Sequence, residues 1–212
     1  MSFNLHQSHP WHGIPPGDEC PEIVTAYIEI VPADTVKYEI DKASGHLKVD
    51  RPQKFSSLCP APYGFIPQTF CGPQVARLAM EKTSRPEMRG DGDPLDICVL
   101  TEKHFSHGAF LLRARPVGGL LMIDKGEADD KIIAVLVDDP AYGHFRDLSD
   151  VPVPIIDRLR HYFLTYKLPP TPAGLGADPV EIPQVYDRAA AHEVIRRSLA
   201  DYQGKFSPLM AT

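Results

Sequence analysis

Gly90-Asp91-Gly92-Asp93-Pro94-Leu95-Asp96 places three carboxylates within six residues, between two glycines and a proline. Residues two apart in an extended segment point to the same face, ~7 Å apart, so Asp91 and Asp93 are expected to point together. Pro94 fixes its own φ and restricts the residue before it, which lets the chain turn and bring Asp96 to the same point. Because three ionised carboxylates this close repel one another, the segment predicts a divalent cation that prefers oxygen ligands, such as Mg²⁺.

Two other interpretations of this segment are an acidic turn and a calcium-binding loop. An acidic turn is the ordinary interpretation of an isolated Asp-x-Asp. A calcium loop would place Glu102 at the twelfth position from Asp91, but that motif needs glycine where Asp96 stands and an oxygen ligand where Leu95 stands. The apolar run Ile97-Cys98-Val99-Leu100 instead predicts a buried strand that leaves the acidic segment.

The composition points to one domain and argues against several classes of protein. A chain of 212 residues can bury one core, so we expect a single domain over residues 1–212. The net charge of -6 disfavours nucleic-acid binding, which depends on basic residues that neutralise phosphates. The longest aliphatic run, residues 132–137, is too short for a bilayer, no secretory signal is visible, and the four cysteines show no Cys-x-x-Cys spacing. We therefore expect a cytoplasmic protein with reduced thiols and no membrane partner.

Alternating apolar and polar residues predict a series of short strands. The first three are expected at residues 25–31, 36–40 and 47–49, and the turn Asp41-Lys42-Ala43-Ser44-Gly45 makes a hairpin of the second and third. Further strands are expected at residues 109–114, 119–123 and 131–137, with residues 127–130 in the turn before the last.

The other segments predict an arm, an insertion and two helices. Residues 1–22 are broken by prolines and glycines and are expected to lie over the core as an arm anchored by Trp11. Residues 70–90 are polar and charged, which predicts an exposed surface insertion with one short helix near residues 75–82.

The two main helices are expected in the C-terminal third. The first follows Ser149, with Asp150 as its N-cap, and ends near Tyr166 and Lys167; a loop at 169–183 and a helix at 187–202, capped by Asp187, complete the chain. Short strands followed by helices predict a mainly β (α+β) fold, a closed or nearly closed antiparallel barrel with α-helices on its outside.

Charged residues at strand ends accompany the acidic segment. The acidic ones are Glu29, Glu39, Asp124 and Asp129, and the basic ones are Lys37, Arg51, Lys131 and Lys167. Each alone is an ordinary surface charge. Together they describe a pocket for a polyanionic phosphate, in which two metal ions ~3.5 to 4 Å apart can lower the pKa of a water and balance charge on the leaving phosphate. Asp93 could then accept the proton of that water.

These residues resemble those of a known family. The signature Asp-x-Asp-Pro-x-Asp of the family I soluble inorganic pyrophosphatases is met by Asp91, Asp93, Pro94 and Asp96, and the similarity runs from about residue 27 to 167. The other similar blocks are Ile28-Glu29-Ile30, Lys37-Tyr38-Glu39-Ile40-Asp41-Lys42, Gly45, Asp50-Arg51, Tyr63-Gly64, Arg115-Pro116-Val117-Gly118, Asp124, Asp129-Asp130-Lys131, His161-Tyr162-Phe163 and Tyr166-Lys167.

The resemblance implies hydrolysis of pyrophosphate to two phosphates, with several Mg²⁺ ions, on a five-stranded OB-like barrel. Asp93 would be the general base, and the cavity would include Glu29 and Glu39. The implied metal ligands are Asp91, Asp96, Asp129 and Asp124, and the implied phosphate-binding residues are Lys37, Arg51, Tyr63, Lys131, Tyr166 and Lys167. Bacterial members are commonly homohexamers, so a homo-oligomer is expected.

Three departures from the family and three alternatives stay open. The loop between Glu29 and Lys37 is one residue shorter than in the family. Cys59 stands where most members have a tyrosine, and the 70–90 insertion is longer than the link in many bacterial relatives. The alternatives are a metal-binding OB-like module without turnover, an OB-type module for single-stranded nucleic acid, and a phosphomonoesterase with an aspartyl nucleophile. The acidic charge disfavours the second, and the hairpin that precedes the acidic segment disfavours the third, which needs a βαβ sheet.

Overall fold

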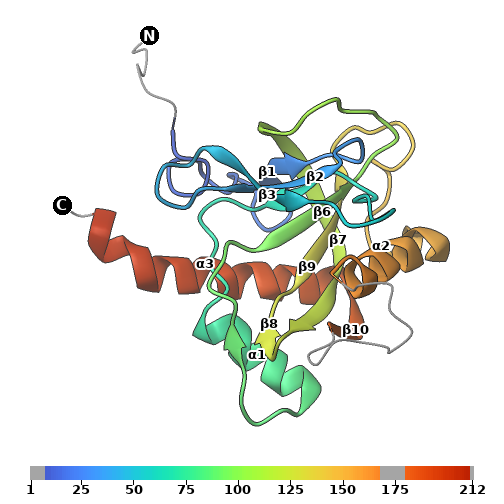
Figure 1. The fold of residues 1–212 in the computed structure, drawn as a ribbon. Coiled ribbons are helices and arrows are strands. Elements are labelled where there is room, and N and C mark those ends of the chain that lie inside the picture. The colour runs from blue at the N-terminus through green and yellow to red at the C-terminus, as the bar shows by residue number, and fades with distance from the viewer. Residues whose placement is uncertain (1–7, 168–179, 211–212) are drawn as a thin grey trace.

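A computed structural model describes residues 8–167 and 180–210 of the chain, with side chains through residue 206. The strands lie at the centre of the molecule and three α-helices lie around them (Figure 1). In chain order the elements are β1 (Val24–Ile30), β2 (Val36–Ile40), β3 (Leu47–Pro52), β4 (Tyr63–Phe65), α1 (Pro73–Thr83), β5 (Arg89–Gly90), β6 (Asp96–Leu100), β7 (Phe110–Asp124), β8 (Glu127–Ala128), β9 (Lys131–Leu136), a 3-10 turn (Leu148–Asp150), α2 (Val153–Thr165), β10 (Glu181–Asp187) and α3 (Arg188–Met210).

Five strands close into a ring in the order β1, β4, β6, β9, β7 and back to β1. The predicted five-stranded OB-like barrel is therefore confirmed. One pair departs from the antiparallel prediction, because β6 and β9 run parallel. β2 and β3 form a separate hairpin beside the ring, as predicted.

Both faces of the central strands are buried, which explains their continuous apolar runs. Ile97 and Val99 of β6 pack in the cluster that includes α1 and α3, whereas Cys98 and Leu100 pack in the cluster that includes α2. Strand alternation sends neighbouring side chains to opposite faces. The helices therefore complete two apolar layers, one on each side of the barrel wall.

The strands predicted at residues 109–114 and 119–123 are one continuous strand, β7, so that prediction of two strands is wrong. A register shift between Pro116 and Gly118 in its pairing with β9 absorbs the proline without ending the strand. The first half of β7 pairs with β1 and the second half with β10. The sequence did not predict β10, whose first residues fall in the expected loop at 169–183; most of that loop lies outside the described residues.

The predicted surface insertion at residues 70–90 is exposed on one face only. Helix α1 is present, but it buries Val75, Ala76, Leu78 and Ala79 against the core shared with α3. The prediction followed the charged residues, which lie on the outer face of the segment. The apolar residues of α1 recur at helical spacing and form part of the core.

The N-cap predicted for the first main helix is also wrong. Asp150 belongs to the 3-10 turn, where its carboxylate accepts the N–H groups of Arg146 and Asp147, and α2 begins after Pro152. Asp187 does cap the last helix, since its Oδ1 accepts the Ala190 N–H at 2.9 Å. That helix continues to Met210, beyond the predicted end near residue 202.

The described part of the N-terminal arm lies over the core and Trp11 anchors it. Trp11 is only 4% exposed, and its indole Nε1–H donates to the Thr69 carbonyl at 2.7 Å. Its ring contacts Phe206 of α3 at 5.4 Å between centroids. The arm therefore joins α3 to the segment that precedes the acidic one.

Candidate active site

A cavity of about 220 Å³ gathers nearly all of the predicted site residues. Of the predicted set, only Arg51 does not line it. The charged and tyrosine side chains around it are Glu29, Lys37, Glu39, Lys42, Tyr63, Asp91, Asp93, Asp96, Asp124, Glu127, Asp129, Lys131, Tyr162, Tyr166 and Lys167.

The innermost wall is formed by Asp91, Asp96, Asp129 and Lys131, called here the acidic cluster. The parallel pairing of β6 and β9 sets Asp96 and Lys131 side by side at the first residue of each strand. The Lys131 ammonium donates to both Asp96 and Asp129, and the Tyr63 hydroxyl donates to Asp96. Lys131 is only 2% exposed, so these ion pairs are shielded from water.

The backbone of the acidic segment is fixed by the strand-like segment before α1. Cys71 N–H donates to the Asp93 carbonyl at 2.8 Å, and Gly92 N–H donates to the Cys71 carbonyl at 3.1 Å. The Asp93 N–H also donates to Asp91 Oδ1 at 3.0 Å. Gly92 has a φ of +79°, which favours glycine, so the segment bends instead of being extended as predicted. Asp91 and Asp93 nevertheless both face the cavity.

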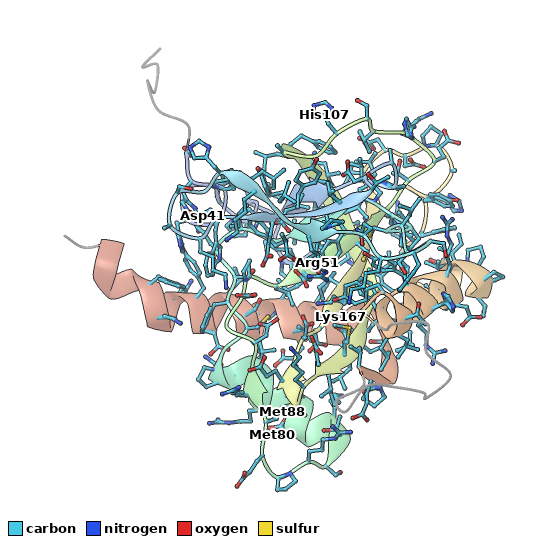
Figure 2. The ribbon with its side chains drawn as sticks, in the orientation of Figure 1. Asp41, Arg51, Met80, Met88, His107 and Lys167 are labelled. Atoms are coloured by element: carbon cyan, nitrogen blue, oxygen red, sulfur yellow. The ribbon has the colours of Figure 1, made fainter. Side chains whose placement is uncertain are left out.

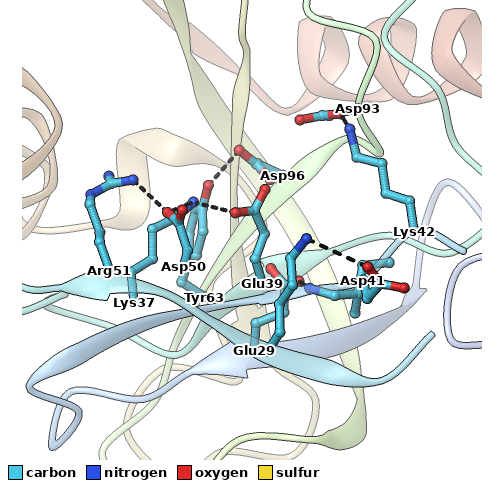
Figure 3. A network of polar contacts seen from close by, with 12 residues as sticks. Glu29, Lys37, Glu39, Asp41, Lys42, Asp50, Arg51, Tyr63, Asp93 and Asp96 are labelled. Carbon is cyan, nitrogen blue, oxygen red and sulfur yellow. Dashed lines mark hydrogen bonds and ion pairs between the residues drawn. The ribbon is translucent and has the colours of Figure 1, made fainter. Parts of the chain in front are cut away.

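Lys37 and Glu39 line the cavity from the hairpin, and Asp50 lies beside Lys37 (Figure 3). Lys37 Nζ lies 3.5 Å from Glu39 Oε2 and 3.3 Å from Asp50 Oδ2. Glu29, on β1, accepts the Ile40 N–H at 2.7 Å, which ties the hairpin to the barrel.

Arg51 lies beside the cavity and not in its lining. Its Nη1 donates to Asp50 at 2.5 Å, and the guanidinium carbon lies 5.7 Å from the centre of the Tyr166 ring. Its Nη2 is buried and has no hydrogen-bond partner among the described residues. A buried donor of this kind is costly unless a ligand completes it.

The end of α2 supplies the third wall. Tyr166 follows the helix, and Lys167 pairs with Asp124 at the end of β7. The carbonyl of Lys167 accepts a hydrogen bond from Lys54 Nζ at 3.3 Å, and Arg51 lies near the same helix end (Figure 2). Lys37 of the hairpin and Lys167, which follows α2, therefore both line the cavity.

The carboxylates of the cavity carry more negative charge than the lysines neutralise. Burial and the neighbouring Asp129 raise the pKa of Asp91 to about 9, and burial raises the pKa of Glu29 to about 8. Burial would also raise the pKa of Asp129, but Lys131 outweighs it and lowers that pKa. The site therefore carries an excess of negative charge that a bound cation would neutralise.

The donor atoms fit a hard divalent cation, although the side chains are not arranged around one. They are carboxylate oxygens, the ligands that Mg²⁺ prefers. Lys131, a cation, already bridges Asp96 and Asp129. Within residues 8–167 and 180–206, no three acidic, histidine or cysteine side chains are grouped closely enough to form a ready ligand set. The chemistry of the site therefore fits a hard divalent cation, with Lys131 holding Asp96 and Asp129 together.

Three charged residues at or beside the cavity were missed by sequence reasoning. Lys42 and Glu127 line it, and Asp50 pairs with Lys37 next to it. Lys42 belongs to a turn and to a block that resembles the family, and Glu127 to a turn, but neither was assigned a role in the site. The position of Lys42, five residues after Lys37 in the same hairpin, is a signal that could have identified it as a site residue. Its contact with Asp93, however, depends on how that hairpin bends.

Cys59, which stands where most members of the family have a tyrosine, is a packed thiol. It is buried and its Sγ–H donates to the Ala61 carbonyl at 3.2 Å. Burial raises the pKa of this thiol to about 12, so the reactive thiolate is disfavoured.

Comparisons with known proteins agree on one family. A family model described as inorganic pyrophosphatase matches residues 26–203. An inorganic pyrophosphatase of Chlamydia caviae is 50% identical over 204 residues, which cover 96% of this chain and 94% of the relative. A soluble inorganic pyrophosphatase of Oryza sativa subsp. indica is 42% identical over 167 residues, 79% of this chain and 69% of the relative. The solved inorganic pyrophosphatase of Thermus thermophilus has a TM-score of 0.74 and 32% identity, with 93% of this chain and 99% of that chain covered. The chain therefore belongs to the inorganic pyrophosphatases, as a member of the soluble family I, a family of hydrolases.

Proposed function

We propose that this protein hydrolyses inorganic pyrophosphate to two phosphates, that it requires Mg²⁺, and that Asp93 is the general base. The observation that carries the proposal is the convergence of the acidic cluster, Asp93, Lys37 and Lys167 on one cavity. Carboxylates for metals on one wall and ammonium groups on the others suit a substrate that is itself a polyanion.

The cations of the cavity bind and orient the substrate. Lys37, Lys131 and Lys167 donate to phosphate oxygens, and the Tyr63 and Tyr166 hydroxyls supply neutral donors. Arg51 contributes its unpaired Nη2 once a phosphate reaches the hairpin end of the cavity. Glu29 and Glu39 line the hairpin side of the cavity, where Glu39 pairs with Lys37, and both would help to hold a metal ion or its waters.

Asp93 accepts a proton from the attacking water as the new P–O bond forms and the bridging P–O bond breaks. It lines the cavity and is part-exposed, so that water and substrate both reach it. Asp91, Asp96, Asp129 and Asp124 would hold the metal ions. When bound, divalent ions lower the pKa of a water and balance the charge on the leaving phosphate.

Two wider expectations belong to this proposal. We propose a homo-oligomer, a hexamer by family resemblance, which analytical ultracentrifugation checks. We also propose a cytoplasmic location, supported by four free cysteines, three of them buried. No helix in the described part of the chain has the length and apolar character needed to cross a membrane.

The test is phosphate release from pyrophosphate with Mg²⁺ and with EDTA, for wild type and Asp93→Asn. Loss of a general base is expected to lower kcat by about 10² to 10⁴-fold. Asp157→Asn is the control, because Asp157 is exposed on α2 and pairs only with Arg160 among the described residues. A folded wild type that binds Mg²⁺ but releases no phosphate would instead support the metal-binding module without turnover.

A further inference from the structure

Lys42 is the most exposed of the four lysines that line the cavity. Its side chain is 50% exposed, against 18% for Lys37, 2% for Lys131 and 34% for Lys167. It reaches from the turn after β2 to Asp93 and pairs with its Oδ1 (Figure 3). Nothing in the established family signature or in the function proposed above uses this lysine.

The partners of the other three lysines are more numerous or more buried. Lys131 is held by Asp96 and Asp129, and Lys37 by Glu39 and Asp50. Among the described residues, Lys42 pairs with Asp93 alone, which is itself 37% exposed. An exposed ion pair is worth little, about 0–1 kcal/mol, so Lys42 can exchange its partner at small cost.

The backbone at Lys42 is fixed by hydrogen bonds, whereas its side chain is half exposed. Gly45 N–H donates to the Asp41 carbonyl at 2.7 Å and closes the turn, with a φ of +74° at Gly45. The N-terminal arm supports the turn from outside, because His9 Nε2 lies 3.2 Å from the Lys42 carbonyl, which accepts its hydrogen bond. The ammonium group of Lys42 can therefore change position over the cavity while the backbone of the turn stays in place.

We propose that Lys42 binds the substrate: its ammonium leaves Asp93 for a phosphate oxygen when pyrophosphate enters, which frees Asp93 to act on water. A polyanionic phosphate attracts an ammonium group more strongly than one part-exposed carboxylate does. In the free protein the same pair keeps a cation close to the point where the substrate arrives. The inference rests on the function proposed above and adds a recognition residue to it.

Lys42→Met tests the proposal, with Lys48→Met as the matched control. Lys48 lies on the same hairpin, is 54% exposed and pairs with Asp41 at 3.6 Å, but it does not line the cavity. Loss of one charge-assisted hydrogen bond is expected to raise KM for pyrophosphate about tenfold in Lys42→Met, with kcat changed much less. Lys48→Met should resemble wild type, and Lys42→Arg should restore most of the lost affinity.

Binding of methylenediphosphonate, measured by calorimetry with Mg²⁺, separates substrate binding from chemistry. Lys42→Met should bind this uncleavable analogue about tenfold more weakly than Lys48→Met does. Equal affinities in the two variants would overturn the proposal, and so would a fall in kcat without any loss of analogue affinity. A wild type that releases no phosphate overturns the proposed function, whereas an active wild type with two equivalent variants overturns only the role of Lys42.

Discussion

The acidic cluster and the β2–β3 hairpin face the same cavity but are held in different ways. The cluster lies at or just before the first residues of β6 and β9, two strands of the barrel ring, and its central cation, Lys131, is buried. The hairpin is a separate two-stranded sheet, and Lys48, Val49 and Asp50 of β3 are exposed. The barrel thus fixes the groups proposed to hold metal ions, while the hairpin presents more exposed cations to an incoming anion.

The difference shows that side chains of equal charge in one site can contribute unequally to the stability of the fold. A buried ion pair, once formed, is costly to break, because the remaining charge has no water. An exposed pair is worth little to stability and is free to change partners. Substitutions in the two regions should therefore separate stability from substrate binding.

The largest effect is expected from Lys131→Met. This change leaves Asp96 and Asp129 buried without their cation, which should lower the free energy of unfolding by about 3–5 kcal/mol. Urea unfolding in EDTA measures it. A loss below about 1 kcal/mol would mean that the acidic cluster is hydrated like the hairpin, contrary to the comparison.

Mg²⁺ should stabilise the wild type through the acidic cluster. At a concentration 100 times Kd, binding to the folded state adds about 2.7 kcal/mol, which raises Tm relative to EDTA. Asp91→Asn should reduce this increment, since it removes a proposed ligand that faces the cavity. Asp157→Asn, on the exposed side of α2, should keep the whole increment; equal increments in both variants would remove Asp91 from the proposed ligands.

Asp201→Ala tests how the fold supports the acidic segment. Asp201 of α3 accepts the N–H groups of Gly72 and Val75, each at 3.1 Å, and caps α1 next to Cys71, which bonds Asp93. Loss of this buried cap should cost about 2 kcal/mol in urea unfolding and lower kcat as well.

Asp187→Ala is the control for Asp201→Ala. It removes the exposed cap of α3, far along the chain from the acidic segment, and should cost about 1 kcal/mol without changing kcat. Similar kcat losses in the two variants would show that any weakened helix end disturbs the cavity, and that Asp201 has no special role.

The smallest stability effect is expected from Lys42→Met. Its pair with Asp93 is exposed on both sides, so the free energy of unfolding should change by less than about 1 kcal/mol. The same urea experiment as for Lys131→Met measures it. A loss close to that of Lys131→Met would erase the distinction between the two regions.

Much of the barrel and nearly all of the cavity were predictable because local patterns and short motifs report on them. Alternation located β1, β2, β3 and β9 within a few residues, and the motif around Asp93 lies where the cavity forms. The two wrong strand predictions have separate causes. β7 reads as two strands because its middle holds a proline and glycines, and β10 reads as a loop because Pro183 interrupts it and its partner residues on β7 lie 58 to 69 positions away.

The sequence by itself determined the residue types of the cavity, the strand pattern and the family, because these depend on neighbours a few positions apart. Tertiary structure alone decided which charges meet. Lys42 reaches Asp93 across 51 positions, and Asp201 caps α1 across 127 positions from Gln74. Such contacts leave no periodic signal, since they depend on how the barrel closes and how α3 packs on it. The closed ring of strands therefore turns separate charged residues into one site.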